Sequence, residues 1–332
     1  MSLQARRYFA IPQAKEASSA NVDTAHKPES FLAICAIFKN EAPYLDEWIR
    51  FHRAQGVEHF YLYNNFSDDN FDEVLKIHER YVTVTPWPIP FTEWGQLKAY
   101  ANCLERNRGS YRWIALIDID EFIFGVAQPL KSELLAYPNV DQILVNCICY
   151  GTSGLDQVPQ GSTTKHLTQR APLWWRRNAQ CKSVVNPQAV LGVKNPHEMD
   201  MDSTKTYASG DGRTVVARRK RRRGRVINRI MKLHQRISVW VSRQNQLVNI
   251  LPKSLLLFLD FYGGGLRFRD GVSRIRINHY VIRSAKEYRD KITRYNTTQF
   301  SEKYNAAFFK FHDQNQVHDP VLSDWESGGM YR

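Results

Sequence analysis

The chain of 332 residues lacks any run of about 18 uncharged apolar residues, so no transmembrane helix is predicted. Its first residues contain no continuous apolar stretch, and a secretory signal is therefore not expected. Cysteine is scarce, with five residues and no C-x-x-C pair. Because Cys35, Cys147 and Cys149 lie in apolar runs, we expect small buried side chains in a reducing compartment, rather than disulfides or a zinc site.

The formal net charge of +13 comes mostly from one segment that has no acidic residues. Residues 213–236 hold eleven Lys or Arg and no Asp or Glu, so the rest of the chain carries a net +2. A nucleic-acid-binding domain would spread its basic surface across the fold. Nucleic acid is therefore not the expected partner of the globular body.

Strand-like and helix-like patterns alternate from Phe31 onward, in a chain whose 43% hydrophobic residues can build a sizeable core. The predicted strands are residues 31–38, 59–64, 81–87, 113–118, 142–150 and 274–281. The predicted helices are residues 45–52, 71–78, 95–106 and 285–294. This alternation predicts an α/β fold with a parallel sheet and helices on both faces, whose ligands bind beyond the carboxyl ends of the strands.

The most informative stretch is WIALIDIDEFIF, in which an apolar run ends in Asp118, Asp120 and Glu121. In a strand, Asp118 and Asp120 would leave the same face, about 6–7 Å apart, and Ile119 would point into the core. Carboxylates so close repel one another unless positive charge lies among them. A hard divalent cation that holds a diphosphate would supply this charge. The alternative is a strand end whose acidic residues cap the next helix.

Six motifs follow one another along the chain. They are CAIFKNE from Cys35, YLYNNFSDD from Tyr61, DIDEF from Asp118, YGTSG from Tyr150, KSVVNP from Lys182 and RINHY from Arg276. In this order they resemble glycosyltransferase family 92 and its bacterial family-2-like relatives, over roughly residues 31–294. The resemblance implies a GT-A-like fold, with a mostly parallel sheet flanked by helices.

The same resemblance implies a metal-dependent enzyme of polysaccharide biosynthesis. Such an enzyme moves a hexose, with inversion, from a nucleotide diphosphate sugar to a glycan or lipid-linked acceptor, with a UDP-sugar as the favoured donor. The ion would be Mn²⁺ or Mg²⁺, held by Asp118 and Asp120, with Asp120 as the direct ligand. Similar enzymes bring a C-terminal histidine to the metal, and here His279 matches, with His197 as a rival. The alternative for His279 is a histidine packed in the core.

Polar residues at the carboxyl ends of the predicted strands are the candidates for donor binding. They are Lys39, Glu41, Asn64, Asn65, Asp69, Gln96 and Asp118. Asn64 stands where the family pattern often has Asp, and an amide can still read a base because it both donates and accepts. The alternatives are a helix N-terminus that favours Glu41 and a plain turn rich in Asn, Ser and Asp.

An inverting transferase needs a general base that deprotonates the acceptor hydroxyl. The candidates in the loop-rich half of the chain are Asp156 and Glu198, with Asp200 and Asp202 beside them. Leu155 stands where the family pattern has His, so no histidine is expected to act there.

The basic segment consists of the tract Arg218–Arg225 and a helix-like pattern behind it. Apolar residues at 226, 230, 233, 237 and 240 alternate with Arg and Lys, which predicts a basic amphipathic helix. We expect residues 213–251 to bind an anionic membrane surface, which would place a cytoplasmic protein at the inner face of the membrane. The alternatives are a solvated insertion, or an inactive α/β domain that binds membranes or nucleic acid through this segment.

The predicted organisation is one main domain with a helical insertion. Residues 1–29 are expected to be a mobile arm, 30–210 the nucleotide-sugar and acceptor domain, 211–265 the basic insertion, and 266–332 the part that completes the catalytic domain.

Overall fold

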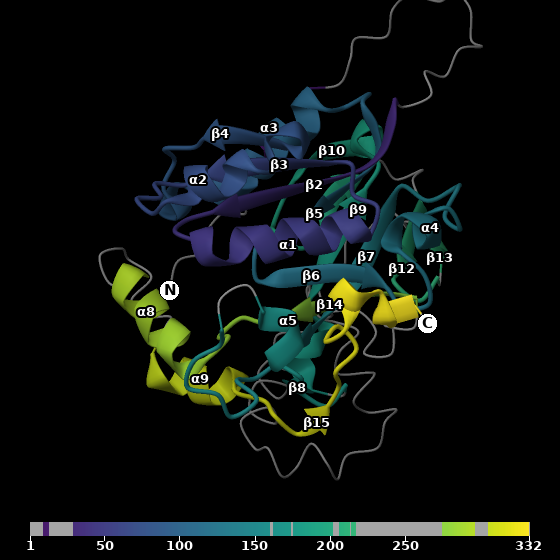
Figure 1. Ribbon diagram of the computed structural model, residues 1–332. Coiled ribbons are helices and arrows are strands. Elements are labelled where there is room, and N and C mark those ends of the chain that lie inside the picture. Colours follow the sequence, from purple (N-terminus) through teal and green to yellow (C-terminus); the bar gives the residue numbers. More distant parts are fainter. Residues whose placement is uncertain are drawn as a thin grey trace, which may run out of the picture.

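The computed structural model describes residues 9–12, 29–159, 162–173, 175–201, 206–212, 214–216, 274–295 and 305–331. Its centre is a sheet of ten strands within these ranges (Figure 1). The strands are β2 Ser30–Phe38, β3 His59–Asn64, β4 Val82–Pro86, β5 Tyr111–Leu116, β6 Glu121–Gly125, β7 Gln142–Cys149, β9 Cys181–Val185, β12 Thr206–Ser209, β13 Thr214–Val216 and β14 Ile275–His279. The predicted strands are therefore confirmed within a few residues at their ends.

The sheet is mostly parallel. The strand order is β13-β12-β7-β9-β5-β2-β3-β4, and β14 pairs with both β7 and β6. Strands β2, β3, β4, β5, β7, β12 and β14 run in one direction, whereas β6, β9 and β13 run in the other. The α/β class expected of a GT-A-like fold is confirmed. The insertion of β9 between β5 and β7 was not predicted from the sequence.

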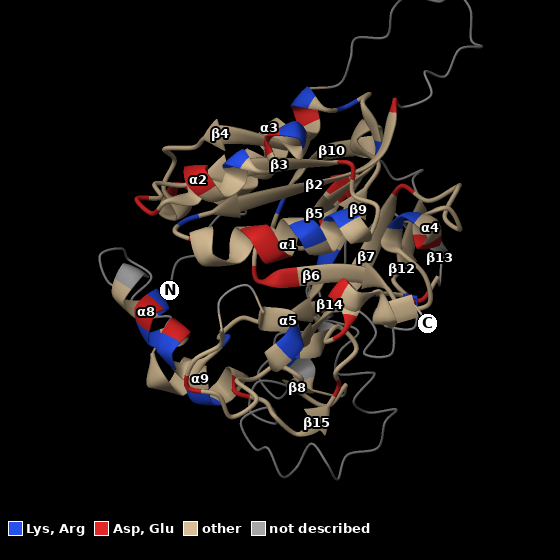
Figure 2. Cartoon of the chain, in the orientation of Figure 1, with Lys and Arg blue, Asp and Glu red and all other residues tan. Residues whose placement is uncertain are grey.

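Helices cover both faces of the sheet (Figure 1). They are α1 Ala42–Ala54, α2 Phe71–Lys76, α3 Gly95–Arg106, α4 Leu130–Leu134, α5 Thr163–His166, α8 Ala285–Tyr295 and α9 Ala306–His312. Alternate residues of β2 face opposite sides, so Ile34 packs in one cluster with Trp48 of α1, and Cys35 packs in another with Tyr100 of α3. Charged residues of both signs are interspersed along the described helices and strands (Figure 2).

Part of the expected N-terminal arm packs on the body. β1 Phe9–Ala10 pairs with β10 Val190–Val193, which pairs in turn with β11 Met199–Met201. Ile11 is only 3% exposed and lies in the cluster on the α3 face. Residues 9–12 therefore belong to the folded body rather than to a mobile arm.

The C-terminal segment lies against α1 and the loop after β7. Trp325 packs edge-on against Phe51 of α1 at 5.2 Å, and Tyr331 donates a hydrogen bond of 2.8 Å to Gln55. Another pair of short strands, β15 Val317–His318 and β8 Gln169–Arg170, ties this segment to the loop region.

No helix in the described ranges is long and apolar enough to cross a membrane. All five cysteines are buried and free, as expected. The basic tract Arg218–Arg225 and the amphipathic pattern behind it lie outside the described residues.

Candidate active site

The two aspartates of the D-x-D motif lie in a turn and not in a strand. β5 ends at Leu116, and residues 117–120 connect it to β6. The turn is closed from both sides, because the Glu121 carboxylate accepts the Asp118 N–H at 2.9 Å and the Asp118 carbonyl accepts the Glu121 N–H at 3.1 Å. Ile119 is buried, as predicted, but no helix follows for the aspartates to cap. The prediction that both carboxylates leave the same face of a strand is therefore wrong, and the two carboxylates have different partners.

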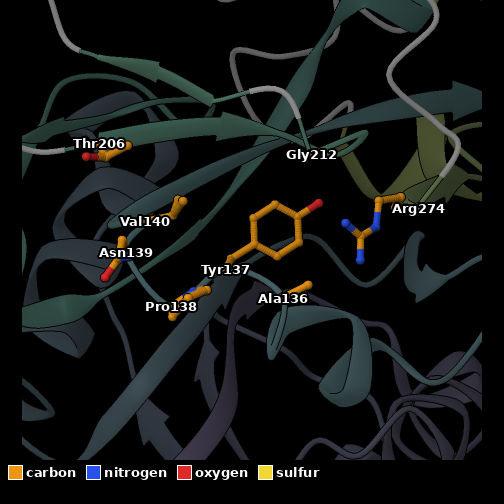
Figure 3. Close-up of a pocket in the computed structure, with 8 residues that line it drawn as sticks. All are labelled: Ala136, Tyr137, Pro138, Asn139, Val140, Thr206, Gly212 and Arg274. Carbon is orange, nitrogen blue, oxygen red and sulfur yellow. The ribbon is translucent and has the colours of Figure 1, made fainter.

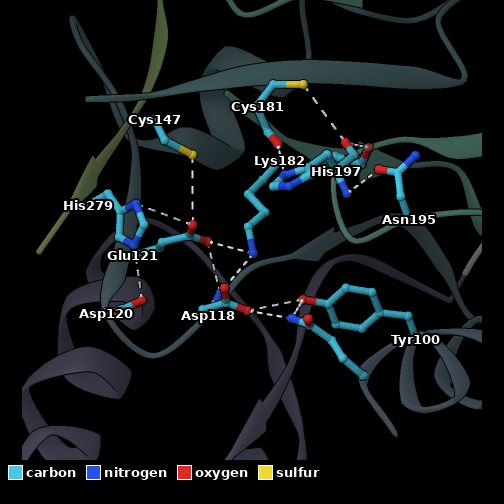
Figure 4. A network of polar contacts seen from close by, with 12 residues as sticks. Tyr100, Asp118, Asp120, Glu121, Cys147, Cys181, Lys182, Asn195, His197 and His279 are labelled. Carbon is cyan, nitrogen blue, oxygen red and sulfur yellow. Dashed lines mark hydrogen bonds and ion pairs between the residues drawn. The ribbon is translucent and has the colours of Figure 1, made fainter. Parts of the chain in front are cut away.

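A buried lysine supplies the positive charge beside Asp118 (Figure 4). Lys182 of β9 places Nζ 2.7 Å from Asp118 Oδ2 and 3.2 Å from Glu121 Oε2. Burial alone would lower the pKa of Lys182, but these two carboxylates raise that pKa well above its usual value. Lys182 therefore stays charged and offsets the repulsion between the carboxylates.

The other oxygen of Asp118 faces α3. Gln96, at the start of that helix, donates to Asp118 Oδ1 at 2.8 Å, and the Tyr100 hydroxyl lies 3.3 Å from the same atom. The structure thus brings together Gln96 and Asp118, two residues predicted to bind the donor. The Asp118 side chain is 35% exposed, so it is open to a ligand from one side.

Asp120 has a separate set of cationic neighbours. His279 ends β14, which runs antiparallel to β6, and its Nε2 lies 3.4 Å from Asp120 Oδ1. Lys291 of α8 approaches the other oxygen at 3.3 Å. Burial would raise the pKa of Asp120, but Lys291 and His279 hold it well below the usual range. Burial alone would lower the pKa of His279, but the neighbouring Asp120 carboxylate raises that pKa well above its usual value.

The donor chemistry at Asp120 and His279 fits a divalent cation. A carboxylate oxygen and an imidazole nitrogen lie side by side there, and both are suitable ligands for Mn²⁺ once the imidazole has released its proton. Asp118 is turned away to Lys182 and Gln96 and does not join this pair. Across the residues that the structure describes, no three His, Cys, Asp or Glu side chains are already arranged around a metal position.

The predicted donor-binding asparagines build the loop after β3. Asn64 Oδ1 accepts the Ser67 N–H at 2.9 Å. Asn65 is buried, and its amide donates to the carbonyls of Trp87 and Ile89, both at 2.8 Å. These hydrogen bonds give both asparagines a structural role in the loop. Direct contact of either asparagine with a nucleotide stays a prediction.

Asp69 and Glu41 both act at the N-terminus of α1. Asp69 Oδ2 accepts the Ala42 N–H at 2.8 Å, so it satisfies one of the free donors of that helix. Glu41 pairs with Arg283 at 3.0 Å, and the Arg283 guanidinium stacks 3.3 Å from the Tyr44 ring. Lys39 is half-buried at the end of β2. A role of these residues in donor binding stays a prediction.

The two candidate bases have partners outside the carboxylate turn. Asp156 is largely exposed and pairs with Arg289 at 3.0 Å. Glu198 is half-buried and its N–H donates to Asn195 Oδ1 at 3.0 Å. His197 beside it hydrogen-bonds the Cys181 carbonyl, and burial lowers its pKa to about 4. Asp202 lies outside the described residues, and the identity of the base stays a prediction.

The sequence model of glycosyltransferase family 92 matches residues 30–227, which is more than half of the chain. The chain belongs to glycosyltransferase family 92. Its similar relatives include a family 92 protein of Oryza sativa subsp. japonica, 34% identical over 168 residues, which are 48% of this chain and 27% of that protein. Another is the β-1,4-galactosyltransferase galt-1 of Caenorhabditis elegans, 28% identical over 39% of this chain and 33% of that protein. The chain thus spans about a third or less of these relatives.

Solved structures resemble this family 92 chain only loosely. The S. aureus protein TarS in complex with UDP has 17% identity and a TM-score of 0.33, over 47% of each chain. Glucosyl-3-phosphoglycerate synthase of Mycobacterium tuberculosis, with Mn²⁺ and UDP, has 12% identity and a TM-score of 0.30, over 48% of this chain and 58% of that one. Scores this low carry no argument about the site.

This family 92 protein also has a pocket of about 310 Å³. The residues that line the pocket are drawn in Figure 3. Tyr137, Val140, Thr206 and Arg274 are among its lining residues. They lie next to the first residues of β7, β12 and β14, whereas Asp118 and His279 lie at the opposite strand ends. The pocket is therefore not part of the candidate active site.

Three cations of the family 92 site were not found by sequence reasoning. Lys182 belongs to the KSVVNP motif, which could have pointed to it. Arg283 and Lys291 follow the RINHY motif, in a region where nothing in the pattern distinguishes a buried cation from a solvated one.

Proposed function

We propose that this family 92 protein is a glycosyltransferase that moves a hexose from a nucleotide diphosphate sugar, with UDP as the nucleotide, to a glycan or lipid-linked acceptor. The observation that carries the proposal is the turn at Asp118–Glu121, where carboxylates, an imidazole and two lysines meet at the ligand-binding edge of an α/β sheet. Family membership and a relative named as a β-1,4-galactosyltransferase support the reaction class.

In this proposal Asp120 and His279 would hold Mn²⁺ or Mg²⁺, which when bound neutralises charge on the diphosphate leaving group. Lys182, Gln96 and Tyr100 fix the Asp118 carboxylate, so that its exposed side can orient the donor. Lys291 adds positive charge beside Asp120. Inversion would use Asp156 or Glu198 as the base that takes the acceptor proton.

Nucleotide binding tests the donor assignment. We expect UDP with Mn²⁺ to raise the melting temperature of the protein, since a ligand at 100 times its Kd stabilises a fold by about 2.7 kcal/mol. A panel of nucleoside diphosphates with and without Mn²⁺ identifies the base. If chelation of the metal leaves the UDP-induced shift unchanged, the metal assignment is wrong.

Turnover tests the role of Asp120. The Asp120→Asn variant keeps the shape of the side chain and removes its charge, so we expect loss of sugar transfer with an intact fold. The Asp72→Asn variant, on the exposed side of α2, is the matched control and should transfer sugar at the wild-type rate. Near wild-type transfer by Asp120→Asn would remove this residue from the metal site.

We further propose that the protein is cytoplasmic and binds the inner face of the membrane through residues 213–251. The support is the eleven basic residues of 213–236, because each cation near anionic lipid contributes about 1 kcal/mol. Deletion of residues 218–225, which leaves strand β13 in place, should weaken sedimentation with anionic liposomes at low salt and leave UDP binding intact. Tight, salt-sensitive binding of DNA or RNA by the full chain would instead favour the nucleic-acid alternative.

A further inference from the structure

The loops after β2 and β3 are locked together by side-chain hydrogen bonds. Asn40 and Asp68 bond each other reciprocally, since Asn40 Nδ2 donates to Asp68 Oδ1 at 2.6 Å and the Asp68 N–H donates to Asn40 Oδ1 at 2.8 Å. The Asn40 N–H also donates to Ser67 Oγ at 2.9 Å. Together with the bonds of Asn64 and Asn65, these contacts fix the backbone on both sides of Phe66.

Phe66 is presented outward from this fixed loop. Its backbone is left-handed, with φ of 59°, and its side chain is 50% exposed. Bulky residues rarely adopt this conformation, in which glycine is favoured, and a half-exposed ring gains only part of the stabilisation that full burial gives. Fold stability therefore does not account for phenylalanine at this position.

Phe66 lies at the same edge of the sheet as the carboxylate turn. β2 lies between β3 and β5, so the loop after β3 is two strand spacings, about 10 Å across the sheet, from the turn after β5. A nucleoside diphosphate whose phosphates lie at Asp118–Asp120 can extend along this edge and reach the end of β3. The polar groups of Asn64 and Asn65 described above are engaged within the loop, which leaves the Phe66 ring as an available surface.

We propose that Phe66 is the stacking platform for the nucleobase of the donor. This inference rests on the proposed function, because it assumes a nucleoside diphosphate at the carboxylate turn. An aromatic ring binds the flat face of any base without reading its edge. Phe66 would then contribute affinity for the nucleoside, and the choice among bases would come from other contacts.

Calorimetry with UDP, uridine and pyrophosphate, each with Mn²⁺, tests the proposal on the full chain. The Phe66→Gly variant should bind UDP and uridine roughly 5- to 150-fold more weakly, the loss expected for one base stack, and bind pyrophosphate as the wild type does. Phe66→Trp should keep UDP affinity. Phe311→Ala is the matched control, because Phe311 is 42% exposed and lies on α9.

The outcomes separate this inference from the proposed function. If Phe66→Gly binds UDP and uridine within twofold of the wild type, the stacking role is wrong and the proposed function stands. If Phe66→Gly also loses pyrophosphate affinity, the change acts on the whole site, and the specific role is again overturned. If the wild type binds no nucleoside diphosphate, the proposed function itself fails. Phe66→Ala and Phe66→Trp give the same comparison should the glycine variant not fold.

Discussion

Lys182 Nζ lies 2.7 Å from Asp118 Oδ2 and 3.2 Å from Glu121 Oε2, although the lysine side chain is only 4% exposed. Glu121 is buried as well, at 1% exposure. An ion pair this deeply buried is costly to break, because removal of one partner leaves the other charge without compensation. Lys182 therefore holds the carboxylate turn together.

Replacement of Lys182 by methionine should strongly destabilise the fold. We expect a loss of about 3–5 kcal/mol in the free energy of unfolding, measured by chemical denaturation, because the buried Glu121 carboxylate loses its nearest cation. The double variant Lys182→Met with Glu121→Gln should recover part of this loss. Lys194→Met, at a position 48% exposed, is the control and should change stability by less than about 0.5 kcal/mol. A Lys182→Met protein as stable as this control would contradict the buried-pair argument.

His279→Ala separates a metal ligand from a core histidine. If His279 is a ligand, the Mn²⁺ concentration needed for half-maximal turnover should rise at least tenfold. The melting temperature without metal should fall as well, because the variant also loses the ion pair with Asp120. The measurement is a Mn²⁺ titration of activity beside a thermal melt in chelator. A large drop in the metal-free melting temperature with an unchanged Mn²⁺ requirement would return His279 to the core.

Stability should fall in mild acid because of His52. This histidine is fully buried, with Nδ1 bonded to the Trp48 carbonyl at 2.8 Å and Nε2 accepting the Ile123 N–H at 3.1 Å, so only the neutral ring fits. Burial lowers its pKa to about 3, whereas in the unfolded chain the pKa is about 6.5. The unfolded state therefore binds the proton first as the pH falls.

The contribution of His52 is complete above about pH 6.5 and is lost progressively between there and pH 3. By pH 5 the loss should be about 2 kcal/mol, measured by denaturation at a series of pH values. The His52→Gln variant, whose side chain can still accept the Ile123 N–H, should show a shallower pH dependence. If the free energy of unfolding falls equally steeply with pH in both proteins, His52 does not control the loss of stability in acid.

Variants of Asp69 can distinguish a role in capping helix α1 from a direct contact with the donor. Because its carboxylate accepts the Ala42 N–H at the start of α1, Asp69→Ala should cost about 0.5–2 kcal/mol of stability. Asp69→Asn keeps an acceptor oxygen and should cost less. UDP affinity should be unchanged in Asp69→Asn if the residue is only a cap, and a large loss of affinity at normal stability would show a direct donor contact.

The local elements were predictable, whereas the partners of the site residues were not. The apolar run through Ile34 and Cys35 and the spacing around Trp48 indicate a buried strand and an amphipathic helix from neighbouring residues alone. The position of Lys182 depends on β9, which pairs antiparallel with both β5 and β7. These strands are far apart in the sequence, so local patterns do not predict which of them pair. Alternation also suggested that the strand continued through Asp118, but the Glu121 side chain closes a turn there.

The strand order leaves β6 without its pairing partner during much of the synthesis of the chain. Its strand partner is β14, which emerges from the ribosome more than 140 residues later, after the whole basic segment. Until then the strand that begins with Glu121 presents an open edge of apolar sequence, which is prone to pair with other chains. Fragments that end before residue 274 should therefore need chaperones to stay dispersed, and the Asp120–His279 pair can form only after residue 279 has been synthesised.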